Sequence, residues 1–86
     1  MKPIVEKATE EQRVDVQSWP VWEHDADKFD YEYTDKEEFY VVEGKALVHC
    51  DDGTVEFGAG DYVEMPAGLK CTWEILEKVV KHYRFE

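Results

Sequence analysis

The chain has 86 residues, of which 43% are hydrophobic and 14% aromatic, and its formal net charge is −11. This length allows one domain, which buries only about 60–65% of the surface that its unfolded chain exposes. The hydrophobic residues are spread along the chain, as in a globular protein. Because an acidic surface repels phosphate groups, we expect no binding to nucleic acid or to anionic membranes.

The sequence also predicts a cellular setting. No run approaches the roughly 18 apolar residues of a membrane span, and residues 1–13 lack the apolar core of a secretory signal. The two cysteines, Cys50 and Cys71, do not have the spacing of a metal-binding Cys-x-x-Cys pair. We therefore expect a cytoplasmic protein with two reduced thiols.

The N-terminal segment is polar and charged. Residues 1–13 are expected to form a loosely held arm, because a helical turn at its end would lack an apolar stripe. Val14 and Val16 flank an aspartate and predict a brief strand. Trp19 and Trp22 surround a proline, and we expect their indoles to pack against the domain surface.

Two strands are predicted in the middle of the chain. Phe29, Tyr31 and Tyr33 alternate with acidic residues, so the three rings share one face. Residues 37–43 follow a turn and are apolar on both faces beyond their first two residues. A strand that is apolar on both sides is covered on both sides. In so small a chain a second subunit would provide the outer cover, so we expect a homodimer.

The second half of the chain alternates strands with turns. Gly44 is predicted to break the strand before it, and an Asp-Gly pair at 52–53 to form a hairpin turn. A further turn is expected at Glu77 and Lys78. The predicted strands cover residues 14–16, 29–33, 37–43, 45–50, 54–57, 62–65, 71–76 and 79–85. About eight short strands without a long helix predict an all-β fold, an antiparallel barrel or sandwich formed by residues 14–86.

Two motifs resemble those of the cupin family. The first has the form G-x5-H-x-H-x3-4-E-x6-G, and Glu37 lies seven residues before Gly44, as its second half requires. The second has the form G-x5-P-x-G-x2-H-x3-N, and Gly60, Pro66 and Gly68 match its first half. The wider pattern resembles small cupins grouped with the cupin domain of (S)-ureidoglycine aminohydrolase and with the cupin of ethanolamine utilisation. The resemblance implies a single-domain cupin, an antiparallel β-barrel or jelly roll.

The resemblance also implies a position for a metal, which typical cupins hold with three histidines and one glutamate. In this chain Tyr31 and Tyr33 stand at the first two histidine positions, Glu37 is kept, and Cys71 stands at the third histidine position. A phenol and a thiol must each lose a proton to bind a metal, and their ordinary pKa values are about 10 and about 8.5. Hard divalent ions prefer carboxylate, imidazole and water. We therefore expect no metal cofactor, with a softer ion held by Cys71 and Glu37 as the alternative.

The same positions line the predicted pocket. Cys71 and Trp73 share a strand face just past a Pro-x-Gly turn, which is typical of a cavity wall. Glu37 would be desolvated among aromatic rings, and desolvation raises a carboxyl pKa. It would then act as a general acid or base or pair with a cationic ligand, or it would only accept hydrogen bonds from the two tyrosines. The predicted ligand-binding residues are Tyr31, Tyr33, Glu37, Cys71 and Trp73.

Glu37 and Cys71 are the two candidate catalytic residues. A catalytic thiol needs a nearby cation or base to lower its pKa. Lys81 or His82 on the last strand would supply one, and only one of these neighbours can point inward. An inert buried cysteine is the alternative.

Three functions follow from these observations. The first is a small cupin whose pocket binds a small polar, amine or ureido molecule without the usual metal, with Glu37 as the polar anchor and Trp73 as the stacking wall. The second, by analogy with the relatives, is an enzyme of the (S)-ureidoglycine aminohydrolase type that uses a metal or Glu37 as base. The third is a dimeric structural or regulatory module whose pocket is unused.

Overall fold

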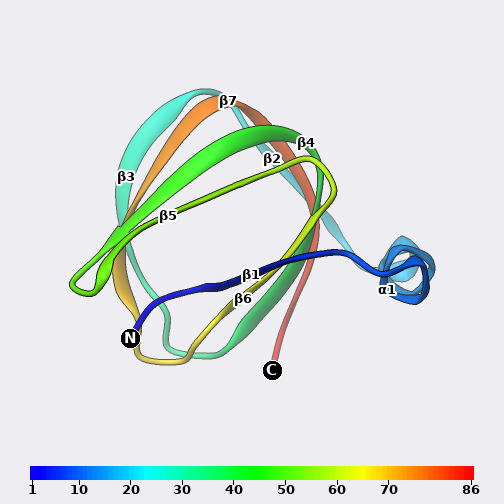
Figure 1. Cartoon of the computed structure of the whole chain (residues 1–86), viewed down its shortest axis with the longest axis horizontal. Helices are drawn as coiled ribbons and strands as arrows, with labels where there is room; N and C mark the ends of the chain where they lie inside the picture. The colour runs from blue at the N-terminus through cyan, green and yellow to red at the C-terminus, as the bar shows by residue number, and fades with distance from the viewer.

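The computed structural model describes residues 1–86, in which seven strands form one antiparallel sheet that curls into a barrel-like shape (Figure 1). The strand order is β1-β6-β4-β7-β2, and β3 and β5 pair with β7 and β4 beside this path. The predicted all-β antiparallel fold is confirmed. The strands are β1 (Ile4–Lys7), β2 (Val21–His24), β3 (Asp27–Glu32), β4 (Glu37–Cys50), β5 (Gly53–Gly58), β6 (Asp61–Met65) and β7 (Lys70–Phe85).

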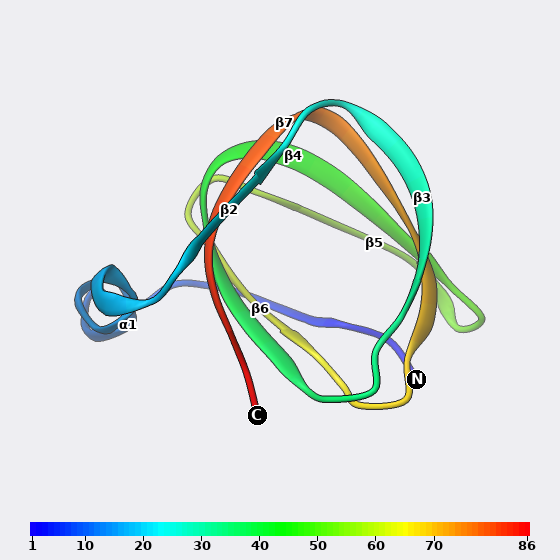
Figure 2. The ribbon, with the colours of Figure 1, turned by 180° about the vertical axis from the view of Figure 1, so that it is seen from behind.

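The two longest strands, β4 and β7, run side by side around the barrel (Figure 2). They pair from Glu37 opposite Phe85 to His49 opposite Thr72, with shifts of register between residues 41 and 46. The predicted break at Gly44 and the predicted turn at residues 77–78 are therefore wrong. Both places are bends within continuous strands, because bulges let a long strand curve without ending. At each of these two places, two strands that the sequence predicts separately form one long strand, so the observed strands are longer than predicted.

The N-terminal segment is more ordered than the expected loose arm. Its strand β1 pairs with β6 along four residues, from Ile4 opposite Glu64 to Lys7 opposite Asp61. Of these β1 side chains only Val5 is half-buried, and it packs against the core. The side-chain pattern of β1 does not predict a strand, because the strand is stabilised by backbone hydrogen bonds to its neighbour at the edge of the sheet.

A short helix, α1 (Glu10–Asp15), and a 3₁₀ turn, η1 (Val16–Ser18), replace the strand predicted at residues 14–16. Thr9 caps the helix: its hydroxyl accepts from the N–H of Gln12, whose side chain accepts in return from the N–H of Thr9. This reciprocal cap satisfies two N–H groups that a short helix would leave unpaired. The helix lies at the side of the barrel (Figure 1), and no helix in the structure is long and apolar enough to cross a membrane.

The hydrophobic core fills the inside of the barrel. Inward side chains alternate along β7 without a change of phase, whereas along β4 the inward set passes from Phe39 and Val41 to Ala46 and Val48 across the bulges. The thirteen core residues are Tyr33, Phe39, Val41, Ala46, Val48, Phe57, Val63, Met65, Leu69, Cys71, Trp73, Ile75 and Val79.

Candidate functional site

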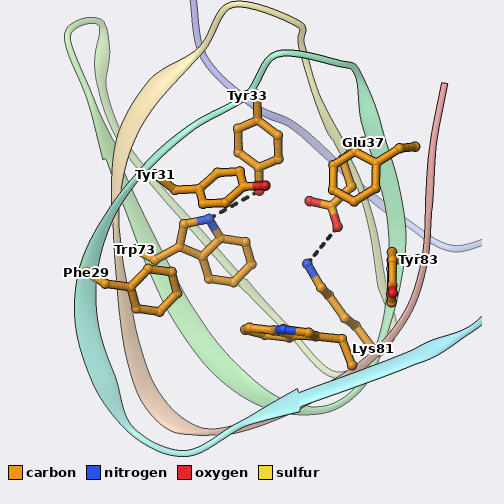
Figure 3. Close-up of a pocket in the computed structure, with 9 residues that line it drawn as sticks. Phe29, Tyr31, Tyr33, Glu37, Trp73, Lys81 and Tyr83 are labelled. Carbon is orange, nitrogen blue, oxygen red and sulfur yellow. Dashed lines mark hydrogen bonds and ion pairs between the residues drawn. The ribbon is translucent and has the colours of Figure 1, made fainter.

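A cavity of about 170 Å³ opens beside this core, between β2, β3 and the paired ends of β4 and β7. Figure 3 shows that its side chains approach a shared space from these different strands. Seven of the nine lining residues are hydrophobic, and the two charged ones come from β4 and β7. The lining residues are Trp22, Phe29, Tyr31, Tyr33, Glu37, Trp73, Lys81, Tyr83 and Phe85.

The two charged lining residues form a buried ion pair. Nζ of Lys81 donates to Oε2 of Glu37 over 2.8 Å, and the two residues are only 5% and 2% exposed (Figure 3). Glu37 is the first residue of β4, and the antiparallel pairing with β7 brings the end of β7 alongside it. Attraction within such a pair is strong because little water screens it, and the same burial makes either charge costly without the other.

Aromatic rings surround the Lys81 ammonium. Nζ lies 4.1 Å from the ring centre of Phe39, 4.6 Å from that of Trp22 and 4.8 Å from that of Trp73. The electron-rich faces of such rings attract a cation. Burial lowers the pKa of Lys81, and the charge of Glu37 opposes that shift. The ammonium therefore depends on one carboxylate and on ring faces in place of water.

Tyr33 provides a second polar group at the cavity wall. Nε1 of Trp73 donates to the Tyr33 hydroxyl oxygen over 3.3 Å. Burial raises the pKa of Tyr33, and the nearby charge of Glu37 raises it further, so the phenol stays protonated. The Pro-x-Gly turn holds this residue: the Tyr33 N–H donates to the carbonyl of Leu69 over 2.8 Å, and the N–H of Gly68 donates to the Tyr33 carbonyl over 2.7 Å.

Flat aromatic surfaces complete the cavity. Phe29 lies parallel to Trp73, with ring centres 6.1 Å apart and planes at 9°. Tyr31 meets Tyr33 edge to face at 4.6 Å and is 43% exposed, so Tyr31 stands at the solvent side of the cavity. Aromatic rings therefore make up most of the surface that a small flat ligand would meet.

Four of the five predicted ligand-binding residues line this cavity, and Cys71 does not. Its thiol lies in the core beside β3, where Sγ donates to the carbonyl of Tyr31 over 3.6 Å. Burial raises the pKa of Cys71 to about 11. A protonated thiol outside the cavity is the arrangement of an inert buried cysteine.

Sequence reasoning left open whether Lys81 or His82 points inward, and the structure selects Lys81. His82 lies on the opposite face of β7, where its Nδ1 is 3.2 Å from the carbonyl oxygen of Trp19. The signal was present in the sequence, because Lys81 has the same phase as Trp73 and Ile75. A turn assumed at residues 77–78 would break this alternation, so the sequence-based prediction does not extend it to Lys81.

The residues at the positions implied for a cupin metal do not fit such an ion. Glu37 is the only carboxylate, imidazole or thiolate-forming group that lines the cavity, and its carboxylate already binds the Lys81 ammonium. The structure has no group of three or more His, Cys, Asp or Glu side chains that could hold a metal. The chain thus places an internal cation beside the carboxylate that metal-binding cupins use as a ligand.

Comparison with known proteins identifies the family. A family model described as the EutQ-like cupin domain matches residues 11–83. The chain belongs to the EutQ-like cupin family. A DUF861 family protein from Thermotoga maritima is 39% identical in sequence to this cupin. Its crystal structure matches with a TM-score of 0.92 over 99% of this chain and all of that one. No curated protein matches the chain.

Structures of EutQ itself share the fold of this cupin. The EutQ protein of Clostridium difficile is 22% identical, with a TM-score of 0.70 over 76% of this chain and 52% of that one. A putative ethanolamine utilization protein EutQ of Salmonella typhimurium is 23% identical, with a TM-score of 0.69 over 76% of this chain and 53% of that one. This cupin therefore spans about half the length of these two EutQ structures.

Proposed function

We propose that this EutQ-like cupin binds a small, uncharged molecule that carries a carbamoyl or ureido group, and that it does so without the usual cupin metal. The observation that carries the proposal is the Glu37–Lys81 ion pair, which lies at the wall of an otherwise aromatic cavity. Of the ligands predicted from the sequence, polar, amine or ureido, this geometry favours the ureido class.

A carbamoyl group complements this ion pair. Its carbonyl oxygen accepts hydrogen bonds and would face the Lys81 ammonium, and its N–H groups donate and would face the Glu37 carboxylate. The hydrogen bonds would be charge-assisted, which makes each roughly twice as strong as one between neutral groups. The flat group would also stack against the rings of the cavity.

Charged ligands fit the same pair less well. The ammonium of an amine would lie near the like charge of Lys81, and a carboxylate near that of Glu37. Each would also lose its hydration in a largely apolar cavity. The ligand must also be small, since the cavity volume of about 170 Å³ is below the roughly 300–1,000 Å³ of pockets for drug-sized ligands.

A titration with molecules of one shape and different charge tests the proposal. Methylurea and propionamide are the carbamoyl probes, and propionate and propylamine are their charged counterparts. Trp22 and Trp73 line the cavity, so their fluorescence should report binding. We expect saturable changes with the two carbamoyl probes and weaker or no changes with propionate and propylamine.

Two variants show whether the Glu37–Lys81 ion pair is responsible for ligand binding. Lys81→Met should abolish the response to methylurea, whereas Lys45→Met, which removes an exposed ion pair with Glu56, should leave it unchanged. If Lys81→Met does not fold, the ranking of the four probes on the wild-type protein still decides the matter. Equal responses to all four, or none, would contradict the proposal, and no response would favour a module with an unused pocket.

A second candidate is an enzyme that hydrolyses a carbamoyl or ureido compound, by analogy with (S)-ureidoglycine aminohydrolase. The buried Glu37 carboxylate at the cavity wall favours it, because such a group can serve as a general base. Its metal-dependent form is not proposed, since the donor set does not fit. Ammonia release from methylurea that is lost in Glu37→Gln would support the enzyme, and no release would leave the binding role alone.

A further inference from the structure

The geometry points to a covalent role for Lys81: its amine forms a Schiff base with a small uncharged aldehyde or ketone that enters the cavity. This inference uses the same cavity as the proposed binding function but goes beyond it, because it requires a reaction at Nζ. Its test can therefore fail or succeed separately from the binding test.

Lys81 differs from the other lysines of the chain by its surroundings. Lys45 and Lys78 form ion pairs over 3.3 Å and 3.4 Å at the surface, where their side chains are 45% and 51% exposed. The Lys81 side chain is 6% exposed and borders the cavity, so a small molecule there would lie next to Nζ. Removal of water favours the neutral amine, which is the nucleophilic form of lysine, while the charge of Glu37 favours the ammonium.

Nζ of Lys81 has one hydrogen-bond acceptor, the carboxylate of Glu37. An ammonium has three N–H donors, and besides Glu37 the neighbours of Nζ are the rings of Phe39 and the two tryptophans, which accept no ordinary hydrogen bond. Glu37 is thus the only group in direct contact that can take a proton from the ammonium and return it. A nucleophilic lysine beside a single carboxylate is the minimal set for imine formation.

The reaction balances with these two residues alone. The Lys81 ammonium gives one proton to the Glu37 carboxylate, and the lone pair on Nζ attacks the carbonyl carbon. The carbonyl π electrons move to oxygen, and a proton passes from nitrogen to that oxygen to give a neutral carbinolamine. The carboxylic acid of Glu37 then protonates the hydroxyl, which leaves as water while the nitrogen lone pair forms the C=N⁺ bond. One carbonyl compound and one ammonium become one iminium and one water, with Glu37 again a carboxylate.

The site suits the product as well as the reactant. The iminium keeps the single positive charge of the ammonium, so Glu37 still pairs with it and the rings still contact a cation. The carbonyl compound must be uncharged for the reasons given for the binding function. The small cavity limits it to a small aldehyde or ketone.

Reductive trapping of the wild-type protein tests the inference. The protein is incubated briefly with propionaldehyde and sodium cyanoborohydride at neutral pH, and peptide mass spectrometry measures propylation at each lysine. We expect Lys81 to be modified about ten-fold or more faster than Lys45 and Lys78, since the cavity would hold the aldehyde beside Nζ and Glu37 is placed to move the protons. Modification of Lys81 that is no faster than at those two lysines would overturn the inference.

An arginine substitution provides the matched control. Lys81→Arg keeps a cation beside Glu37 but cannot form an imine under these conditions, and it should lose the fast adduct, while Lys45→Arg should retain it. A fast adduct that persists in Lys81→Arg would also overturn the inference. Methylurea binding without fast trapping would leave the proposed function standing alone, and fast trapping without methylurea binding would leave only the covalent role.

Discussion

Nζ of Lys81 lies 2.8 Å from Oε2 of Glu37, and both groups are shielded from water by the aromatic rings inside the barrel. The pair joins the start of β4 to the end of β7, and it gives the cavity a donor and an acceptor side by side.

Removal of one member of the pair should destabilise the protein. Lys81→Met leaves the Glu37 carboxylate buried without its partner, and we expect it to lower the free energy of unfolding by about 3–5 kcal/mol. Lys45→Met breaks an exposed pair and should cost about 0–1 kcal/mol. Guanidinium chloride denaturation monitored by tryptophan fluorescence measures both.

A double substitution separates the cost of an unpaired charge from that of lost packing. Glu37→Leu combined with Lys81→Met removes both charges, so most of the stability lost in Lys81→Met should return. If Lys81→Met costs no more than Lys45→Met, the pair is not buried in solution as the structure has it.

Gly44 controls how closely β4 approaches β7. Its φ is 102°, and a Cβ there would lie 2.1 Å from the carbonyl oxygen of Lys78. Gly44→Ala must therefore both strain the backbone and push the two strands apart. Gly53 also has positive φ, at 126°, but a Cβ there meets nothing within 4 Å.

Gly53→Ala is accordingly the matched control, with backbone strain of about 1–3 kcal/mol and no clash. We expect Gly44→Ala to lower the melting temperature clearly more than Gly53→Ala does. Equal shifts would show that the contact with β7 relaxes at little cost.

Cys71 should react slowly with electrophiles in the folded protein. Burial raises its pKa to about 11, so at pH 8 its thiolate fraction is on the order of a hundred-fold below that of an ordinary thiol. We expect iodoacetamide to modify Cys71 at least about a hundred-fold faster after denaturation. Similar rates in the folded and denatured protein would instead support the nucleophilic role that the sequence suggested.

The homodimer predicted from the sequence remains a proposal. Phe39 and Val41 face the core, whereas Val42 points outward and is 44% exposed in the single chain. A second copy that covers this face would be displaced by a charge there, so Val42→Glu should shift the protein toward monomer in sedimentation velocity. Val14→Glu, at a 67% exposed position on α1, should leave the dimer intact. A wild-type protein that sediments as a monomer would refute the prediction.

The sequence predicts the fold well where side chains decide it. Alternation correctly places Trp73 inward, and the turn around Gly68 is where the sequence puts it. Prediction from the sequence fails where backbone pairing or backbone geometry determines the fold. Strand β1 pairs as an edge strand with little apolar content, and the bend at Gly44 depends on contact with β7.

The site was predicted in part for the same reason. Tyr33 and Glu37 line the cavity as expected, because motif spacing fixes their positions. Lys81 was only one of two alternatives, since an assumed turn broke the phase of β7 before it. Cys71 shares the inward phase of Trp73, yet alternation alone does not say which part of the interior a side chain reaches.

The most direct test of the account is a crystal structure of the protein soaked with methylurea. We predict that methylurea lies in the cavity, with its carbonyl oxygen within hydrogen-bond distance of Nζ of Lys81 and an N–H group directed at Glu37. An empty cavity after soaking, or methylurea bound in contact with neither Glu37 nor Lys81, would contradict this claim.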